Sequence, residues 1–384
     1  MDFITKQLLV YFIDLVCKNM IMKKILYSSL LIALSYLAEP ITGYTQAPAK
    51  PGNGLFESDK ILEITLTGNV KDLLNDRGDN PQLHPITVVY KGDDSSEISI
   101  PAEGKTRGHF RKLRENCYYP PILVQFTKSD ALKSSIFNEQ NKLKLVTPCK
   151  DDDFVVREWL VYKLYNLVTP KSFRARLVMV KLNNAKNNKT DPPFYGILLE
   201  EENQMAKRNG LVAVTRKIDP EQAEQDAFIT LTVFEYLIGN TDWGVQYLQN
   251  IKLIAVDSLN EPTAVAYDFD HAGLVSAPYA KPAEELLMND VRQRRYRGYC
   301  ITDMTKFDAS IALFNRIKND VYALYNNCSL IDEKYKKSTI KFLDEFYATI
   351  NNPDKVKKEF GYPCDKKGTG HIIIGGMKVQ NENE

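Results

Sequence analysis

Two acidic segments in the second half of the chain carry the side chains best suited to binding a metal ion. Asp242 lies in the run Asn-Thr-Asp-Trp, Asn250 follows it, and Asp268 and Asp270 lie in Tyr-Asp-Phe-Asp. Carboxylate and amide oxygens are ligands that suit Mg²⁺. In phosphoryl transfer, one aspartate orients or deprotonates the acceptor hydroxyl, while an asparagine and a second aspartate hold the metal ion against the phosphates. This division predicts Asp242 as the catalytic residue and Asn250, Asp268 and Asp270 as metal ligands.

A structural interpretation of the same residues stays open beside this one. Asn240 follows a predicted helix and can cap it while Trp243 packs, and the two later aspartates can cap a chain reversal. If residues 263–270 instead continue as a strand, Asp268 and Asp270 share one face with two alanines, which leaves room for a ligand.

Phosphate chemistry also needs cations, and the first half of the chain offers two groups of them. The first group lies in a loop with two glycines, Gly104 and Gly108, which permit a close approach of the backbone to a ligand. Arg107 and Arg111 in this loop supply fork-shaped donors for phosphate oxygens. A solvated basic turn is the ordinary alternative.

The second group lies on the strand Lys-Leu-Lys-Leu-Val, where alternation places Lys142 and Lys144 on one face. Glu158 on the following helix can pair with one of these lysines. We expect the lysines and Glu158, together with the two arginines, at a nucleotide site. An exposed strand face and a surface glutamate are the ordinary alternatives.

Hydrophobic periodicity predicts the elements that must position these residues. Strands are expected at 61–67, 86–90, 96–101, 120–126, 142–146, 176–182, 195–200, 251–256, 263–268 and 371–374, and helices at 154–168, 220–239, 306–326 and 331–350. The pattern predicts an α+β protein of two lobes, with a β-rich N-terminal lobe at 60–210 and a mainly helical C-terminal lobe at 211–384. The catalytic and metal-binding loops belong to the second lobe, and a cleft is expected between the two.

The N-terminal region has the layout of a secretory signal peptide at 22–46, with a basic start, an apolar run and then small residues. Residues 1–21 precede that start, so the true start codon is expected at Met22, with Met20 as the alternative, and 47–59 reads as a linker. A transmembrane anchor is the alternative, but the apolar run is short for one. We expect an exported protein, periplasmic, cell-surface or extracellular, with no stable membrane span after cleavage.

Cysteine spacing agrees with export, because it contains no pattern typical of zinc sites. Cys117 and Cys149 border neighbouring predicted strands and are expected to form a disulfide. A further pair is expected among Cys300, Cys328 and Cys364, leaving one thiol free.

The charge of the chain is nearly balanced, with a formal net charge of +1, which gives no indication of nucleic-acid binding. One local exception is the basic run Arg292–Arg297. It is either a solvated face or a surface that selects an acidic substrate.

The order of these features resembles the CotH-type secreted kinase family. It consists of the basic loop, the KLK strand, an Asp-rich helix start with Glu158, then YGILLEE, NTDW with a later Asn, and YDFD, between Gly104 and His271. The resemblance implies an atypical protein-kinase-like fold that uses ATP with Mg²⁺ (or Mn²⁺).

Carried over to this chain, the resemblance makes Asp242 the catalytic aspartate and gives the metal to Asn250 and Asp268. Lys144 would contact the nucleotide phosphates, with Lys142 as the competing choice. The strand Tyr195–Glu200 would lead to the adenine pocket, so that Glu200 becomes a nucleotide-binding candidate.

The leading hypothesis is therefore an exported, Mg²⁺-dependent CotH-like kinase that transfers the γ-phosphoryl group of ATP to a hydroxyl of a protein or glycan. The alternative is a non-catalytic surface adhesin or binding protein on a kinase-like scaffold. A metal-dependent hydrolase is a third option, but of the histidines that such sites often use, only His271 is near the acidic segments.

Overall fold

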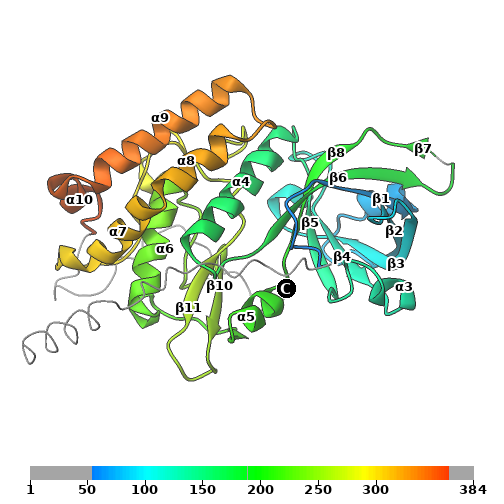
Figure 1. Ribbon diagram of the computed structural model, residues 1–384, viewed down its shortest axis with the longest axis horizontal. Helices are drawn as coiled ribbons and strands as arrows, with labels where there is room; N and C mark the ends of the chain where they lie inside the picture. The colour runs from blue at the N-terminus through cyan, green and yellow to red at the C-terminus, as the bar shows by residue number, and fades with distance from the viewer. Residues whose placement is uncertain (1–53, 188, 363–384) are drawn as a thin grey trace, which may run out of the picture. The chain divides into compact units, whose positions relative to one another are not determined.

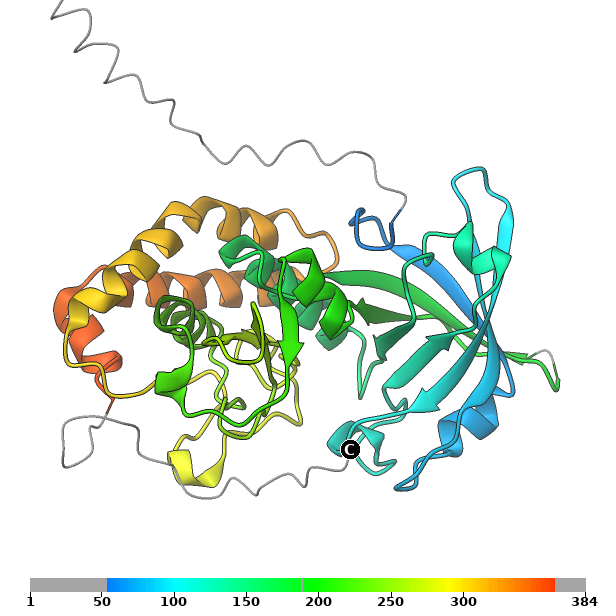
Figure 2. The same cartoon turned by 90° about the horizontal axis from the view of Figure 1, so that it is seen from below.

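Seven strands close into a barrel in the computed structural model, which describes residues 54–187 and 189–362 (Figures 1 and 2). In order around the barrel they are β1 (Leu62–Gly68), β2 (His84–Lys91), β3 (Glu97–Thr106), β4 (Ile122–Phe126), β5 (Lys142–Val146), β8 (Phe194–Leu199) and β6 (Ala175–Asn184). Neighbours pair antiparallel except β1 and β6, which are parallel, with Ile64 opposite Val180. This pairing closes the barrel and makes the sheet mixed. A short β7 (Lys189–Thr190) pairs with the end of β6.

Strands β6 and β8 contribute side chains to two hydrophobic cores, because successive side chains of a strand point to opposite faces. Val178 and Leu198 point into the barrel core, together with residues such as Ile64. Their chain neighbours Leu177 and Ile197 point outward, into a second core. Successive residues of a strand face opposite sides, so an almost unbroken apolar run is what a strand with two buried faces requires. The barrel is thereby joined to the rest of the fold through these strands.

The second core is built from a small sheet and several helices. The sheet is antiparallel, in the order β11 (Thr263–Ala266), β10 (Ile251–Ala255), β9 (Val212–Val214). The main helices are α4 (Asp153–Val168), α6 (Gln225–Ile238), α7 (Asp308–Arg316), α8 (Lys318–Asn326), α9 (Glu333–Ile350) and α10 (Pro353–Glu359). Helix α4 contacts β6, β8, α6 and α8, and in Figure 1 it lies between the barrel and helices α6, α7 and α8.

Shorter elements fill the connections. They are α2 (Val70–Asn75), α3 (Asp130–Lys133), α5 (Glu202–Arg208) and the 3₁₀ turns η1 (Phe110–Lys112), η2 (Pro220–Gln222), η3 (Glu284–Leu286) and η4 (Met304–Phe307).

The expected two-lobed, protein-kinase-like fold with a mainly helical C-terminal lobe is wrong. The strands of the first half do not form an open lobe, because β1 and β6 pair and close them into a barrel. Helices account for a minority of the described residues, and the later part of the chain contributes β9, β10 and β11. The described residues from 54 on group as one compact unit instead of two lobes.

Several local predictions agree with the structure and some need correction. Helix α6 ends at Gly239, which has a φ of 69°, a conformation that glycine adopts at low cost. The helix expected at 306–326 is divided into α7 and α8. Strand β11 ends at Ala266, before the expected end at residue 268, and the backbone turns at Asp268, whose φ is 65°. The expected signal peptide at 22–46 and the strand at 371–374 lie outside the described residues.

The predicted disulfide between Cys117 and Cys149 is confirmed. Cys300 is disulfide-bonded as well, and Cys328 has a free thiol. Within the part of the chain that the structure describes, no helix combines the length and the apolar character needed to cross a membrane.

Candidate functional site

An ion pair joins the barrel to the second acidic segment. Nζ of Lys144, on β5, lies 3.0 Å from Oδ2 of Asp268, which follows β11. Burial alone would raise the pKa of Asp268, but the charges of Lys144 and Arg111 outweigh it and lower this pKa to about 2. Asp268 is therefore an anion at any physiological pH, held where a barrel strand meets the small sheet.

The backbone at Asp268 is held in an unusual conformation. Its φ of 65° lies in the left-handed region, where aspartate is tolerated better than most residues. The N–H of Asp268 donates to the hydroxyl of Tyr162 on α4 at 2.9 Å, and the next residue, Phe269, packs against the ring of Tyr162. Helix α4 thereby fixes the turn that directs the Asp268 carboxylate at Lys144.

A buried cluster lies beside this pair. Arg111 Nη1 lies 3.4 Å from Oδ2 of Asp270 and 3.6 Å from Oε2 of Glu158. The hydroxyl of Tyr279 donates to the same Asp270 oxygen at 3.0 Å. Burial raises the pKa of Glu158 to about 8, although Arg111 opposes the shift. Arg111 thus pairs with the Asp270 carboxylate and also contacts Glu158, whose raised pKa keeps it largely protonated at neutral pH.

Asp242, in the first acidic segment, is held by amides instead of cations. The side-chain amide of Asn250 donates to Oδ2 of Asp242 at 3.1 Å and to its backbone carbonyl at 2.7 Å, and the amide of Gln249 donates to Oδ1. Burial raises the pKa of Asp242, and the charge of nearby His271 opposes that rise. The charges of Asp268 and Asp270 also act on this pKa, so the two acidic segments lie within electrostatic range of each other.

Most of the predicted site residues are therefore brought together. Lys144 reaches the acidic segments and Lys142 does not. The Lys142 side chain is half exposed, and its Nζ lies 3.7 Å from Oε1 of Glu201. Arg107 is partly buried at the end of β3, and its charge contributes to the lowered pKa of Asp268. Glu158 pairs with Arg111 and not with a lysine, which corrects the expected partner.

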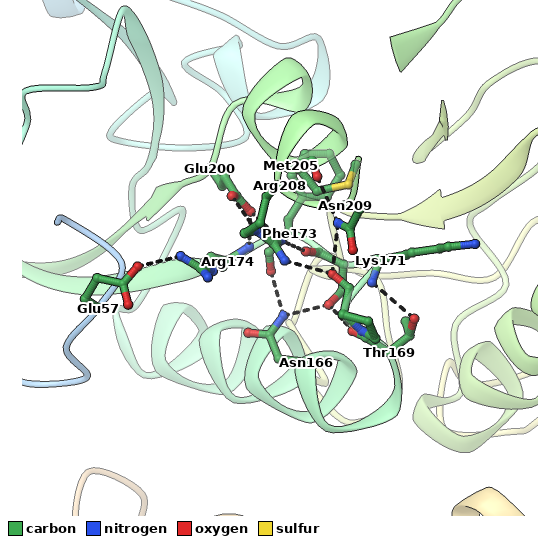
Figure 3. A network of polar contacts seen from close by, with 12 residues as sticks. Glu57, Asn166, Thr169, Lys171, Phe173, Arg174, Glu200, Met205, Arg208 and Asn209 are labelled. Atoms are coloured by element: carbon green, nitrogen blue, oxygen red, sulfur yellow. Dashed lines mark hydrogen bonds and ion pairs between the residues drawn. The ribbon is translucent and has the colours of Figure 1, made fainter. Parts of the chain in front are cut away.

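Glu200 takes part in a separate network (Figure 3). Its carboxylate accepts hydrogen bonds from Arg208, at 2.9 and 3.0 Å, and from the backbone N–H of Arg174, at 2.9 Å. Arg208 also donates to the carbonyl of Ser172 at 2.7 Å, and Arg174 pairs with Glu57 at 2.8 Å. These contacts tie α5, the chain before β6 and the segment before β1 together, so Glu200 is occupied by structural partners.

Gly104 has a packing role in place of the expected ligand contact. It lies inside β3, and a Cβ there would come within 2.8 Å of a methyl group of Leu73 on α2. Gly108 follows β3 with a φ of 84° and open space around it, as a turn requires. Close packing therefore accounts for Gly104, and the backbone conformation of a turn accounts for Gly108.

Asn250 and Asp268 offer oxygen atoms of a type that suits a hard cation. The nitrogen of the Asn250 amide is committed to Asp242, which leaves its Oδ1, with the Asp268 carboxylate, as ligands of the kind Mg²⁺ takes. Asp270 fits less well as a ligand, because Arg111 and Tyr279 share one of its oxygens.

A second acidic group lies at the start of α4. The carboxylates of Asp151, Asp152 and Asp153 lie within 4.8 Å of one another. Asp151 accepts from the backbone N–H of Asp153, and Asp152 accepts from that of Tyr195 at 2.8 Å. These bonds order the helix start and attach it to β8, which accounts for two of the three without a metal.

Three contributors were missed by sequence reasoning. Tyr162 lies one turn after Glu158 on the same face of α4, and that spacing was a usable signal. Gln249 precedes Asn250, but alternation within a strand would have sent it to the other face. Tyr279 lies in a segment without regular periodicity and offered no signal.

Comparison with known proteins adds no identity to this geometry, because no family model matches the chain and no curated protein matches it significantly.

Proposed function

We propose that this protein is a metal-dependent phosphotransferase that moves the γ-phosphoryl group of ATP to a hydroxyl group of a protein or glycan. The observation that carries the proposal is the 3.0 Å pair between Lys144 and Asp268, beside an Asp242 carboxylate that amides hold in place. A lysine for phosphates, an acid and an amide for a metal, and a separate aspartate for the acceptor are the parts that phosphoryl transfer needs.

Each residue has one task in this proposal. Asp268 and Oδ1 of Asn250 would hold Mg²⁺ or Mn²⁺, which neutralises charge on the phosphates when bound. Lys144 neutralises charge on a phosphate oxygen, and Arg107 is the second cation on the same side. The acceptor oxygen forms a bond to the γ-phosphorus, the bond from that phosphorus to the β–γ bridging oxygen breaks, and ADP leaves. The hydroxyl proton passes to Asp242, whose raised pKa suits a proton acceptor.

The proposal depends on these residues and not on the expected fold. The residues that resemble CotH-type secreted kinases include Asp242, Asn250, Asp268 and Lys144, and their proximity supports a related chemistry on a different scaffold. Export is part of the proposal, and the disulfide between Cys117 and Cys149 favours an oxidising compartment.

Incubation of the purified chain with γ-labelled ATP and Mg²⁺ or Mn²⁺ tests the proposal, using the protein itself, casein and a glycan mixture as acceptors. We expect label on an acceptor with the wild-type chain, and none with Asp242→Asn or in the presence of EDTA. Asp130→Asn, which changes an exposed acid on α3, serves as the matched control and is expected to retain activity. Absence of both transfer and nucleotide binding would favour the non-catalytic surface-binding alternative.

A further inference from the structure

The basic run Arg292–Arg297 faces the interior of the protein at three of its four arginines. From the sequence it was either a solvated surface or a selector of acidic substrates. In the structure Arg295 is exposed, whereas Arg292, Arg294 and Arg297 donate to backbone carbonyls of other segments. Carbonyl acceptors give these side chains a role in holding the fold, so the run as a whole is not a substrate surface.

Arg294 binds the C-terminal end of α6. Its guanidinium donates to the carbonyl of Tyr236 at 3.0 Å and to that of Leu237 at 3.2 Å, and it lies 3.5 Å from the centre of the Phe342 ring. The last carbonyls of a helix lack intrahelical partners and carry partial negative charge. Arg294 therefore fixes the point where α6 ends and the segment with Asp242 begins.

Arg292 binds the chain that follows the other acidic segment. It donates to the carbonyl of Gly273 at 3.2 Å and to the hydroxyl of Ser276 at 3.3 Å. Gly273 in turn donates its N–H to the carbonyl of Gly239 at 3.1 Å. The chain after Asp270 and the chain before Asp242 are thus attached both to each other and to the arginine run.

Arg297 makes the contact nearest to Asp242. Its Nη1 donates to the carbonyl of Thr241, the residue immediately before Asp242. Residues 240–250 contain no helix and pair only through the isolated bridge of Gly244 with Gln249. The orientation of the peptide between Thr241 and Asp242 therefore depends on side-chain contacts, and a charged donor is the strong kind.

We propose that Arg297 is a positioning residue for Asp242: by holding the carbonyl of Thr241, it sets the direction in which the Asp242 carboxylate faces the acceptor hydroxyl. This inference rests on the proposed phosphoryl transfer for its effect on turnover. The ordering of residues 240–250 by Arg297 can be measured without any enzymatic activity. This separates the positioning role of Arg297 from the proposed phosphoryl transfer.

The test uses the full chain and three variants, Arg297→Ala, Arg297→Lys and the matched control Arg295→Ala, each checked for an unchanged thermal midpoint. Hydrogen–deuterium exchange reports the amides of residues 240–250, and steady-state kinetics separate kcat from the KM for ATP. For Arg297→Ala we expect faster exchange in this segment. We also expect kcat to fall about 10- to 100-fold with KM unchanged. Guanidinium ion in the buffer is expected to restore part of kcat, Arg297→Lys to be intermediate, and Arg295→Ala to match the wild type.

Unchanged exchange in Arg297→Ala would overturn the inference whatever the activity. An active wild type whose Arg297→Ala variant exchanges faster but keeps its kcat would overturn it as well. If instead the wild type shows no transfer while Arg297→Ala alone exchanges faster, the holding of the loop is supported and the proposed phosphoryl transfer fails. If Arg297→Ala lowers the thermal midpoint, Arg297→Lys becomes the deciding variant, and its hydrogen exchange and kcat are interpreted in the same way.

Discussion

The two acidic segments hold their central carboxylates in opposite ways. Asp268 faces Lys144 at 3.0 Å and lies in the field of Arg111, and its pKa is lowered to about 2. Asp242 receives the amides of Gln249 and Asn250, which are neutral donors, and burial raises its pKa. One carboxylate is stabilised as an anion, and the other is kept closer to its protonated form.

This difference separates two tasks that the same functional group can perform. A carboxylate that binds a metal ion must stay charged. Neighbouring cations keep the pKa of such a carboxylate low, and a bound metal ion can take over part of this stabilisation. A proton acceptor must be able to gain a proton during the reaction, so a raised pKa suits it. The surroundings of each carboxylate thus favour Asp268 as the ligand and Asp242 as the base.

Asp242→Asn is expected to have the largest effect, because it removes the proposed proton acceptor but keeps the shape of the side chain. We expect kcat for phosphoryl transfer to fall about 10²- to 10⁴-fold. The KM for ATP should change little, since Asp242 makes no contact to the phosphates in this account. Steady-state kinetics with a defined acceptor measure both, and a rise in KM with unchanged kcat would place Asp242 in binding instead.

Arg111→Ala is expected to be the most damaging change to stability. It leaves the Asp270 carboxylate buried without its counter-ion and removes the charged partner of Glu158, and breaking a buried ion pair typically costs about 3–5 kcal/mol. Urea unfolding measures the loss, with the exposed Arg114→Ala as the matched control. A loss below about 1 kcal/mol would mean that Arg111 is not the counter-ion that the geometry indicates.

Lys144→Ala and Lys142→Ala sharpen the comparison on the barrel side. Lys144 is nearly buried against Asp268, whereas Lys142 is half exposed. Loss of a charged contact to phosphate corresponds to about 1.5–3 kcal/mol, or roughly 10- to 150-fold in the KM for ATP. We expect that increase for Lys144→Ala and a near wild-type KM for Lys142→Ala. Equal effects in the two variants would contradict the assignment.

Glu235 provides a further test, through the pH dependence of stability. It is buried on α6, and burial raises its pKa to about 8 while the amide of Asn240 opposes the shift. The folded state therefore holds its proton more tightly than the unfolded state. The contribution of Glu235 to the free energy of unfolding is greatest below about pH 4.5. It falls as the pH rises towards 8, by at most about 1.4 kcal/mol per pH unit.

Chemical denaturation at a series of pH values measures this slope. In Glu235→Gln that part of the slope should disappear, and the variant should be more stable than the wild type at pH 8. A variant whose free energy of unfolding keeps the wild-type slope would show that another group is responsible.

Local patterns were sufficient for most elements but not for their arrangement. Alternation predicted the barrel strands near their observed positions, yet nothing local indicates that β1 pairs in parallel with β6, because that pairing joins residues far apart in the sequence. The helical periodicity of the later segments suggested a helical lobe. The short β9, which completes the second sheet, has only three residues and no pattern to detect.

The candidate site shows the same limit. Residue types were enough to propose Asp242, Asn250, Asp268 and Lys144 as site residues, because few residue types offer their chemistry. They predicted a lysine as the partner of Glu158, whereas the packing of the structure places Arg111 against it. Gly104 was misread because a glycine required by a neighbouring methyl group looks the same in sequence as one required by a ligand.

The most direct test of the separation between the two carboxylates is ATP affinity with and without Mg²⁺, measured by isothermal titration for the wild type, Asp242→Asn and Asp268→Asn. We expect Mg²⁺ to strengthen ATP binding in the wild type and in Asp242→Asn alike, and to have no effect in Asp268→Asn. Equal loss of the Mg²⁺ effect in both variants, or its retention in Asp268→Asn, would contradict this expectation.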